Sequence, residues 1–148
     1  MIVDMERNDL SKICKTGSVK IDKLKKVEEY RDLFHYVTTI KGVIKNKMSN
    51  HDIISSLMPG GSVIGCPKIS TIQLLNRKEK FDRNIYTGSF GIIHSNGDMR
   101  FNIMIRTLLN FKNDIELSVA SGVILGSTAK KEYNENYIKA KSLLDLFN

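Results

Sequence analysis

Cysteine and long apolar runs are scarce in this sequence of 148 residues. It has only two cysteines, Cys14 and Cys66, and their wide separation indicates reduced thiols rather than a disulfide or a metal site. No apolar run approaches the length of about eighteen residues that indicates a transmembrane helix. The N-terminal segment MIVDMERNDL carries acidic residues early and lacks the apolar core of a signal peptide. These absences favour a cytoplasmic protein that is not inserted in a membrane.

Repeats, linkers and low-complexity tracts are absent too, and the three histidines, His35, His51 and His94, lack metal-ligand spacing. A hydrophobic content of 41% and a charged content of 26% are ordinary for a globular protein. The length fits one domain, so we expect residues 1–148 to belong to a single domain without an internal boundary.

A net charge of +7 is the usual reason to consider a nucleic-acid partner. The lysines, however, are spread along the chain among acidic residues, and no aromatic residues alternate with them. This pattern is typical of a solvated surface, and it also suits a small anionic substrate. We therefore expect no nucleic-acid partner.

The segment PGGSVIGCPK, residues 59–68, is the most distinctive stretch of the chain. Its glycines have the spacing of a nucleotide-binding P-loop, but Cys66 and Pro67 stand where that motif requires Lys and then Ser or Thr. Pro67 suits the first position of a helix, and apolar residues follow it at helical spacing. The segment therefore predicts a turn that delivers free backbone N–H groups to a helix start, which attracts an anion such as a carboxylate. A plain structural turn is the alternative.

Both helices and strands are predicted in the first half of the chain. Residues 8–17 predict one or two helical turns that end at Gly17, and residues 49–58 predict a helix capped by Ser49 or Asn50. Alternation and β-branched residues in 27–45 favour a strand over a helix.

Three strand-like runs follow, at residues 85–94, 99–111 and 115–125. The pair Asn96–Gly97 between the first two is a strong hairpin signal. The three runs therefore predict an antiparallel meander whose strands are covered on both faces.

The last segment predicts a helix with two neighbouring stripes. Its apolar stripe consists of Ala129, Tyr133, Tyr137, Ala140, Leu144 and Phe147. Beside that stripe, Glu132, Glu135 and Lys139 recur at steps of three and four residues. The carboxylates could hold a hard divalent cation through oxygen ligands, or the stripe could be an exposed face with a Glu135–Lys139 ion pair.

Eight motifs that span nearly the whole chain resemble the chorismate-utilising enzymes in family order. They are MIVDMERNDL, GSVK, FHYVTTIKG, MPGGSVIGCPK, YTGSFGII, NGDMRFNIMIRTL, SGVIL and KEYNENYIKAKSLL. The residues of the motifs PGGS, YTGSFG and FNIMIRT are more similar to component I of aminodeoxychorismate (para-aminobenzoate) synthase than to anthranilate synthase component I. The resemblance implies an α+β fold, in which antiparallel β-sheets form a sandwich with helices outside.

The resemblance also implies a site for chorismate, which carries two carboxylates. The substrate-binding residues that it implies are Ser62, Tyr86, Arg106, Gly122 and Lys139. An arginine suits a carboxylate because its fork pairs with both oxygens.

Further roles implied by the resemblance concern the metal and the chemistry. Glu135 matches a glutamate that ligates Mg²⁺, and Glu132 matches one that supports it. His35 matches the histidine beside the departing hydroxyl group, as an acid or an orienting group. From the residues alone, His35 would be a core histidine on an apolar strand.

Enzymes of this family are about three times longer, so the chain resembles their C-terminal third. A metal-binding glutamate and a nucleophilic lysine of the family precede the part that the chain matches. We therefore expect the chain alone to be weakly active or inactive, with a glutamine amidotransferase subunit and the N-terminal part of the enzyme as partners. Anthranilate synthase component I is one alternative. A non-catalytic remnant, or one half of a split protein, is another.

Overall fold

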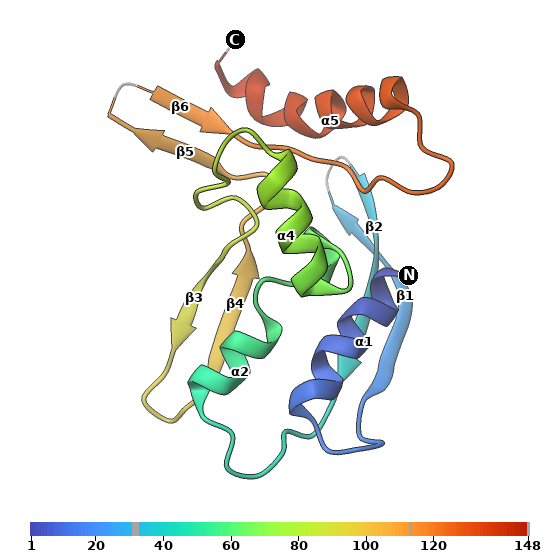
Figure 1. The fold of residues 1–148 in the computed structure, drawn as a ribbon, viewed down its shortest axis with the longest axis vertical. Helices are drawn as coiled ribbons and strands as arrows, with labels where there is room; N and C mark the ends of the chain where they lie inside the picture. The colour runs from blue at the N-terminus through green and yellow to red at the C-terminus, as the bar shows by residue number, and fades with distance from the viewer. Residues whose placement is uncertain (31–32, 113, 148) are drawn as a thin grey trace. The chain divides into compact units, whose positions relative to one another are not determined.

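The structure is a computed structural model that describes residues 1–30, 33–112 and 114–147 (Figure 1). Its helices are α1 (Ile2–Ile13), α2 (Asn50–Leu57), α3 (Gly61–Ile64), α4 (Lys68–Lys78), α5 (Ala129–Leu144) and the 3-10 helix η1 (Asp145–Phe147). Its strands are β1 (Lys20–Tyr30), β2 (Leu33–Lys41), β3 (Ser89–Ile93), β4 (Met99–Ile103), β5 (Leu108–Phe111) and β6 (Asp114–Leu117). Helices combined with antiparallel strand pairs confirm the predicted α+β class. Within the described residues, no helix combines the length and the apolar character needed to cross a membrane.

The chain forms two compact units. Unit 1 contains Met1–Phe81 and Ile92–Arg100, and unit 2 contains Asp82–Gly91 and Phe101–Asn148. The prediction of a single domain without an internal boundary stays a prediction.

Helix α1 is the centre of unit 1 and contacts α2, α3 and β2. It is longer than the one or two turns predicted, and it ends at Ile13, before the turn that contains Gly17 with a φ of 75°. Ile13 and Cys14 are each only 2% exposed, so the small core of this unit lies at the end of α1. Buried Cys14 has a raised pKa because burial disfavours its thiolate, which agrees with the predicted reduced thiol.

Helices α2 and α4 confirm the predictions made for their segments. Ser49 is the N-cap of α2, where its hydroxyl accepts a hydrogen bond from the Asp52 amide at 3.1 Å and Asp52 Oδ2 accepts one from the Ser49 amide at 3.0 Å. Such a capping box satisfies two amides of the first turn. Pro67 is the N-cap of α4 rather than its first helical residue, so the helix begins one position later than predicted.

Residues 20–30 and 33–41 pair with each other as antiparallel strands, whereas the prediction was a strand within residues 27–45. Strands β1 and β2 pair in a register that places Lys20 opposite Lys41 and Glu28 opposite His35. The predicted strand that contains His35 is therefore confirmed as β2, whereas the first part of its segment belongs to β1. Residues 31–32 of that segment lie outside the described residues.

The predicted hairpin at Asn96–Gly97 is confirmed between β3 and β4. Gly97 adopts a φ of 89°, and the Asn96 side-chain oxygen accepts a hydrogen bond from the Asp98 amide at 3.0 Å. The predicted meander is wrong for the described residues, because β4 pairs with β3 and β5 pairs with β6 in separate two-stranded sheets. The run breaks after β4, where Met104 exchanges backbone hydrogen bonds with Thr87 and Gly88.

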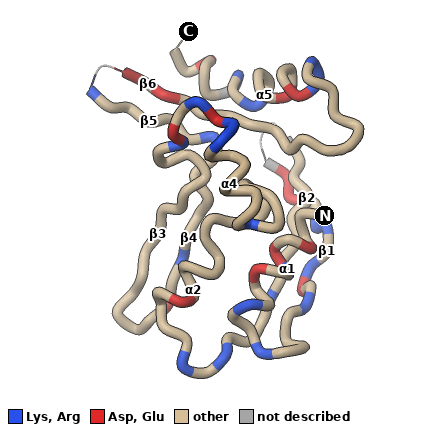
Figure 2. Tube along the Cα trace, in the orientation of Figure 1, with Lys and Arg blue, Asp and Glu red and all other residues tan. Residues whose placement is uncertain are grey.

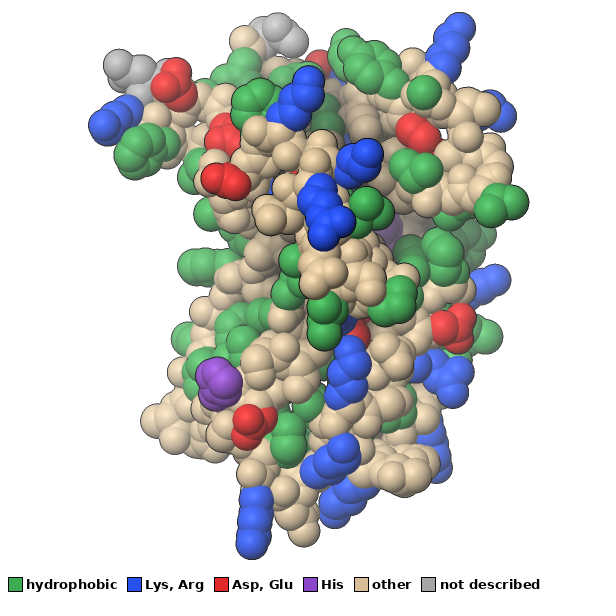
Figure 3. Space-filling view, viewed as in Figure 1, with side chains coloured by type: hydrophobic (Ala, Val, Ile, Leu, Met, Phe, Trp, Pro, Cys, Tyr) green, Lys and Arg blue, Asp and Glu red, His purple; other side chains and the backbone are tan. Residues whose placement is uncertain are grey.

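Many large apolar side chains are exposed, contrary to the predicted cover on both faces of the strands. Phe90 on β3 and Phe111 on β5 are 72% and 64% exposed, and Phe34 and Tyr36 on β2, outside the predicted meander, are 69% and 77% exposed. Apolar side chains are visible among charged ones on the face drawn in Figure 3. Basic and acidic residues are interspersed along α1, β1 and α5, as expected for a solvated surface (Figure 2).

Candidate functional site

Helix α5 turns a polar face, not its apolar stripe, toward the rest of unit 2. Tyr133 is 73% exposed and Tyr137 is also exposed, whereas Glu132, Asn136 and Lys139 are partly buried. The predicted apolar stripe therefore does not form a core, with the exception of Ala140, which is 7% exposed. The polar residues face the segment 118–128, which runs alongside α5 in Figure 1.

Glu132 is tied to that segment by two hydroxyl groups. Hydrogen bonds from Ser121 and Ser127 hold the pKa of Glu132 below its usual value, since they outweigh the effect of burial, and the charge of Lys139 adds to them. Glu132 Oε2 is buried and has no hydrogen-bond partner among the described residues. An ionised carboxylate with a buried, unused oxygen suits a cation or a strong donor as its missing partner.

Lys139 joins the same segment to α5. Its Nζ atom donates a hydrogen bond to the carbonyl oxygen of Ala120 at 3.2 Å and lies 2.7 Å from Glu135 Oε1. The predicted Glu135–Lys139 ion pair is therefore present, and Glu135 is the more exposed of the two carboxylates of the stripe. A Cβ atom added at Gly122 would meet nothing within 4 Å, so its backbone is open to approach.

Tyr86 and Arg106 lie on two segments of unit 2 that are hydrogen-bonded to each other. The Thr87 amide donates to the Met104 carbonyl at 2.9 Å, and the Met104 amide donates to the Gly88 carbonyl at 2.9 Å. Arg106 follows Met104 by two positions and has a φ of 50°, which is unusual for a residue other than glycine. Such conformations are frequent where a structure holds a functional side chain.

Ser62 and His35 belong to unit 1, whereas the other six predicted site residues belong to unit 2. Ser62 lies in α3, directly after Gly61, and His35 is an exposed residue of β2. The exposure of His35 is contrary to its interpretation as a core histidine.

The sequence predicted free backbone amides in the glycine turn, but several of these amides are already hydrogen-bonded within the chain. The Gly61 amide donates to Asp9 Oδ2 at 3.0 Å, and the amides of Val63, Ile64 and Gly65 donate to carbonyl oxygens of the turn itself. The anion that meets the Gly61 amide is thus a carboxylate of this chain.

Several residues that contact the α5 face or the glycine turn were not predicted from the sequence. Asp9, Ser121 and Asn136 lie in the motifs MIVDMERNDL, SGVIL and KEYNENYIKAKSLL, but no role was predicted for them, and Ser127 was not predicted to contact Glu132. Asn136 Oδ1 is buried one turn after Glu132 and, within the described chain, also has no partner. The spacing of Asn136 from Glu132, four residues on one helix, was the available signal.

Few of the described residues could hold a metal ion. No group of three or more His, Cys, Asp or Glu side chains among them is arranged to hold a metal ion. Glu132 fits a hard cation because its orphaned oxygen is buried, and exposed Glu135 stands one turn away.

A surface cavity of about 480 Å³ lies beside α1 in unit 1. It is lined by Asp4, Arg7, Asn8, Ser11, Lys15, Thr16, Gly17 and Val19. None of the eight predicted site residues lines this cavity.

Comparison with known proteins identifies the family. A model of the chorismate binding enzyme family matches residues 1–145, and the chain therefore belongs to that family. It is 37% identical to an anthranilate synthase component I-like protein of Synechocystis over 97% of this chain, and 36% identical to aminodeoxychorismate synthase component 1 of Bacillus subtilis over 95%. The crystal structure of anthranilate synthase component I from Streptococcus pneumoniae is similar, with a TM-score of 0.80, 34% identity and 96% of this chain covered.

The chain spans about 30% of the length of these two curated relatives and 33% of the solved structure. Relatives from both branches match it at nearly equal identity, so the family is shown while the branch is not. The resemblance inferred from the motifs is confirmed at the level of the family.

Proposed function

We propose that this chain supplies the chorismate-binding part of an aminodeoxychorismate synthase component I. The complete reaction would replace the 4-hydroxyl group of chorismate with an amino group, for the synthesis of para-aminobenzoate and folate in the cytoplasm. The observation that carries the proposal is the polar face of α5, where Glu132 keeps a buried oxygen unused and Lys139 reaches a backbone carbonyl. A helix that only stabilised its unit would bury Tyr133 and Tyr137 instead, because apolar burial is the larger stabilising term.

The substrate would be bound through its two carboxylates. Arg106 would pair with one carboxylate through its fork, with the Tyr86 hydroxyl beside it. Lys139 would lie near a carboxylate, Ser62 would donate its hydroxyl, and the bare backbone at Gly122 would allow close approach. These roles have support from the family match and from the open backbone at Gly122.

The proposed cofactor is Mg²⁺, with Glu135 as a ligand and Glu132 as its support. When bound, the ion would supply Lewis-acid assistance to the loss of the ring hydroxyl. His35 would protonate or orient that departing hydroxyl. Because Mg²⁺ requires several arranged oxygen ligands, we expect further ligands from a longer enzyme, of which this chain matches about 30% in its relatives.

Two partners follow from this proposal. A glutamine amidotransferase subunit would provide ammonia, and the N-terminal part of the enzyme would complete the site. We therefore expect the chain alone to bind chorismate but to convert it slowly or not at all.

The test uses purified chain with chorismate, Mg²⁺ and an ammonium salt. Calorimetry should detect chorismate binding, and Arg106→Gln should weaken it, while Arg100→Gln, at an exposed position of strand β4, should not. Product analysis should show little aminodeoxychorismate until the N-terminal two thirds of the Bacillus subtilis relative is added. Failure of the chain to bind chorismate in any of these mixtures would refute the proposal.

A different product, anthranilate, is the second candidate, because the Synechocystis relative at 37% identity carries that name. The fluorescence of anthranilate in the same mixtures separates the two reactions.

A non-catalytic role in association is favoured by one observation, the exposure of Phe34, Tyr36 and Phe90 on the strands. Large exposed apolar side chains and open strand edges promote pairing with another chain. Sedimentation of the isolated chain decides this point, since a clean monomer that binds chorismate would leave no need for such a role.

A further inference from the structure

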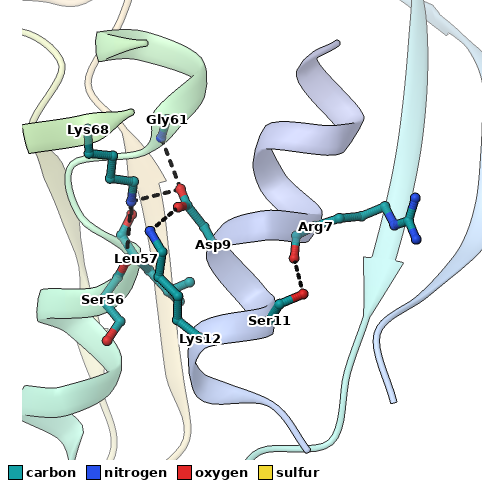
Figure 4. A network of polar contacts seen from close by, with 8 residues as sticks. All are labelled: Arg7, Asp9, Ser11, Lys12, Ser56, Leu57, Gly61 and Lys68. Atoms are coloured by element: carbon teal, nitrogen blue, oxygen red, sulfur yellow. Dashed lines mark hydrogen bonds and ion pairs between the residues drawn. The ribbon is translucent and has the colours of Figure 1, made fainter. Parts of the chain in front are cut away.

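Unit 1 contains a buried charged cluster whose residues have no role in the proposed binding of chorismate or Mg²⁺. It centres on Asp9 of α1, which is 1% exposed. Figure 4 shows its carboxylate between Lys12, Lys68 and the backbone of Gly61. Lys68 Nζ lies 2.7 Å from Oδ2, Lys12 Nζ lies 2.9 Å from Oδ1, and the Gly61 amide donates to Oδ2 at 3.0 Å. Both carboxylate oxygens therefore have partners, as a buried charge requires.

Lys68 extends this cluster to both sides of the glycine turn. Its Nζ atom also donates to the carbonyl oxygens of Ser56 and Leu57, each at 3.2 Å. An ammonium group has three hydrogens, and these three partners use all of them. Because Ser56 and Leu57 close α2 and Lys68 opens α4, the ammonium group ties together the two ends of the segment that carries the turn.

The backbone of the turn has little room to move between its neighbours. A Cβ atom added at Gly61 would lie 2.9 Å from Cys66 Sγ and 3.4 Å from Asp9 Oδ2. At the other end of α3, Gly65 adopts a φ of 106°, and a Cβ atom there would lie 3.0 Å from Thr71 Cγ2. The path of residues 61–65 is thus set by these contacts, and Ser62 directly follows the amide that Asp9 holds.

A buried ion pair is by itself weak evidence for a role, because an apolar pair of similar volume often stabilises a fold equally well. Asp9, unlike an apolar side chain, accepts a hydrogen bond from the Gly61 amide. One carboxylate between two ammonium groups also leaves an excess of positive charge behind the turn. An anionic substrate at the turn is therefore not repelled by Asp9.

We infer that Asp9 is a positioning residue for the turn, and that it directs Ser62, rather than the Gly61 amide, toward a carboxylate of the substrate. The inference rests on the proposed function, since it assigns the substrate contact of the turn to one side chain. Asp9 itself does not touch the substrate. It acts by fixing the backbone from which Ser62 projects.

The first measurement follows amide hydrogen exchange by NMR in the chain without ligand. Asp9→Ala should accelerate exchange at Gly61 at least about tenfold relative to Cys14, whose amide donates to Leu10 and reports on the buried end of α1. Asp4→Ala, at an exposed position of the same helix, should leave the ratio unchanged. Equal acceleration at both amides, or none at Gly61, would overturn the inference whatever the chain binds.

The second measurement compares chorismate binding by the unaltered chain and two variants, using calorimetry. Asp9→Ala should raise the dissociation constant about tenfold or more, because a displaced side chain no longer meets its ligand. Asp9→Leu/Lys68→Met should recover thermal stability but not affinity, since its apolar pair packs without accepting the Gly61 amide. Recovery of both would show that the cluster is only structural. Absence of binding by the unaltered chain would refute the proposed function, and Gly61 exchange would then decide the role of Asp9 in fixing the turn.

Discussion

Lys139 Nζ lies 3.2 Å from the carbonyl oxygen of Ala120, and this hydrogen bond spans 19 residues of sequence. It connects α5 to the backbone two residues before Gly122, the predicted point of substrate approach. The lysine thus holds together two elements to which the family resemblance gives substrate contacts. An ammonium group that donates to a carbonyl and a carboxylate also has a third hydrogen to donate to an anionic partner.

Replacement of Lys139 by methionine should therefore affect binding more than stability. The Glu135–Lys139 pair is partly exposed, and such pairs contribute less than about 1 kcal/mol to the free energy of unfolding. Chorismate affinity measured by calorimetry should fall about tenfold in Lys139→Met, because a charged hydrogen bond is lost. Lys141→Met, on the exposed side of α5, is the control. A fall of equal size in the control would assign the effect to net charge.

Removal of divalent cations should show whether the two glutamates of α5 hold Mg²⁺. A chelator is expected to weaken chorismate binding by the unaltered chain, if oxygen ligands on α5 hold Mg²⁺ against a substrate carboxylate. Glu132→Gln should abolish this response, because the buried orphaned oxygen loses its charge. Asp145→Asn, at the end of the same helix, should retain it. A response that survives in both Glu132→Gln and Glu135→Gln would place the metal elsewhere.

Local signals in the sequence predicted a large part of the fold. Ser49 as an N-cap and the hairpin at Asn96–Gly97 are set by neighbouring residues, and both were found. The hairpin partner β1 was missed, because KIDKLKKVEEY is rich in lysine and lacks a clear alternation of apolar residues. The break of the meander at Met104 depends on its pairing with Thr87 and Gly88, which no local pattern encodes.

The candidate site was predictable only where the family motifs carry it. Glu132, Glu135 and Lys139 were found by their spacing on one helix, and the structure confirms the Glu135–Lys139 pair. The spacing on α5 predicted two neighbouring stripes but not which one is buried, and the polar contacts with the segment 118–128 decide it. Asp9 was not predictable, because its partner Gly61 is 52 residues away in the sequence.

Acid should destabilise unit 1 through Asp9. Burial opposes ionisation of Asp9, but hydrogen bonds from Lys68, Lys12 and Gly61 outweigh it and lower its pKa below the ordinary value of 3.8. The unfolded chain therefore binds a proton more readily than the folded one. The contribution of Asp9 is complete above about pH 5 and is lost as the pH falls through the lowered pKa.

The melting temperature between about pH 5 and pH 3 measures this contribution. Asp9→Asn should lower the melting temperature at pH 5 and flatten its decline with acid. Asp4→Asn should follow the unaltered chain, and a residual slope should remain because the Ser49 hydrogen bonds lower the pKa of Asp52 as well. A decline as steep in Asp9→Asn as in the unaltered chain would contradict the assignment.

Replacement of Arg106 by glycine should raise the stability of the chain and lower its affinity for chorismate. Its φ of 50° is costly for a residue with a side chain, whereas glycine adopts it freely. Arg106→Gly should therefore raise the free energy of unfolding by up to about 1 kcal/mol in a urea titration, while chorismate affinity falls because the guanidinium fork is lost. Lys112→Gly is the matched control, since Lys112 has a φ of 58° but no predicted contact with substrate. It should gain similar stability and keep its affinity. If Arg106→Gly instead kept the affinity of the unaltered chain, the left-handed conformation at residue 106 would serve the chain path between β4 and β5 and not the substrate.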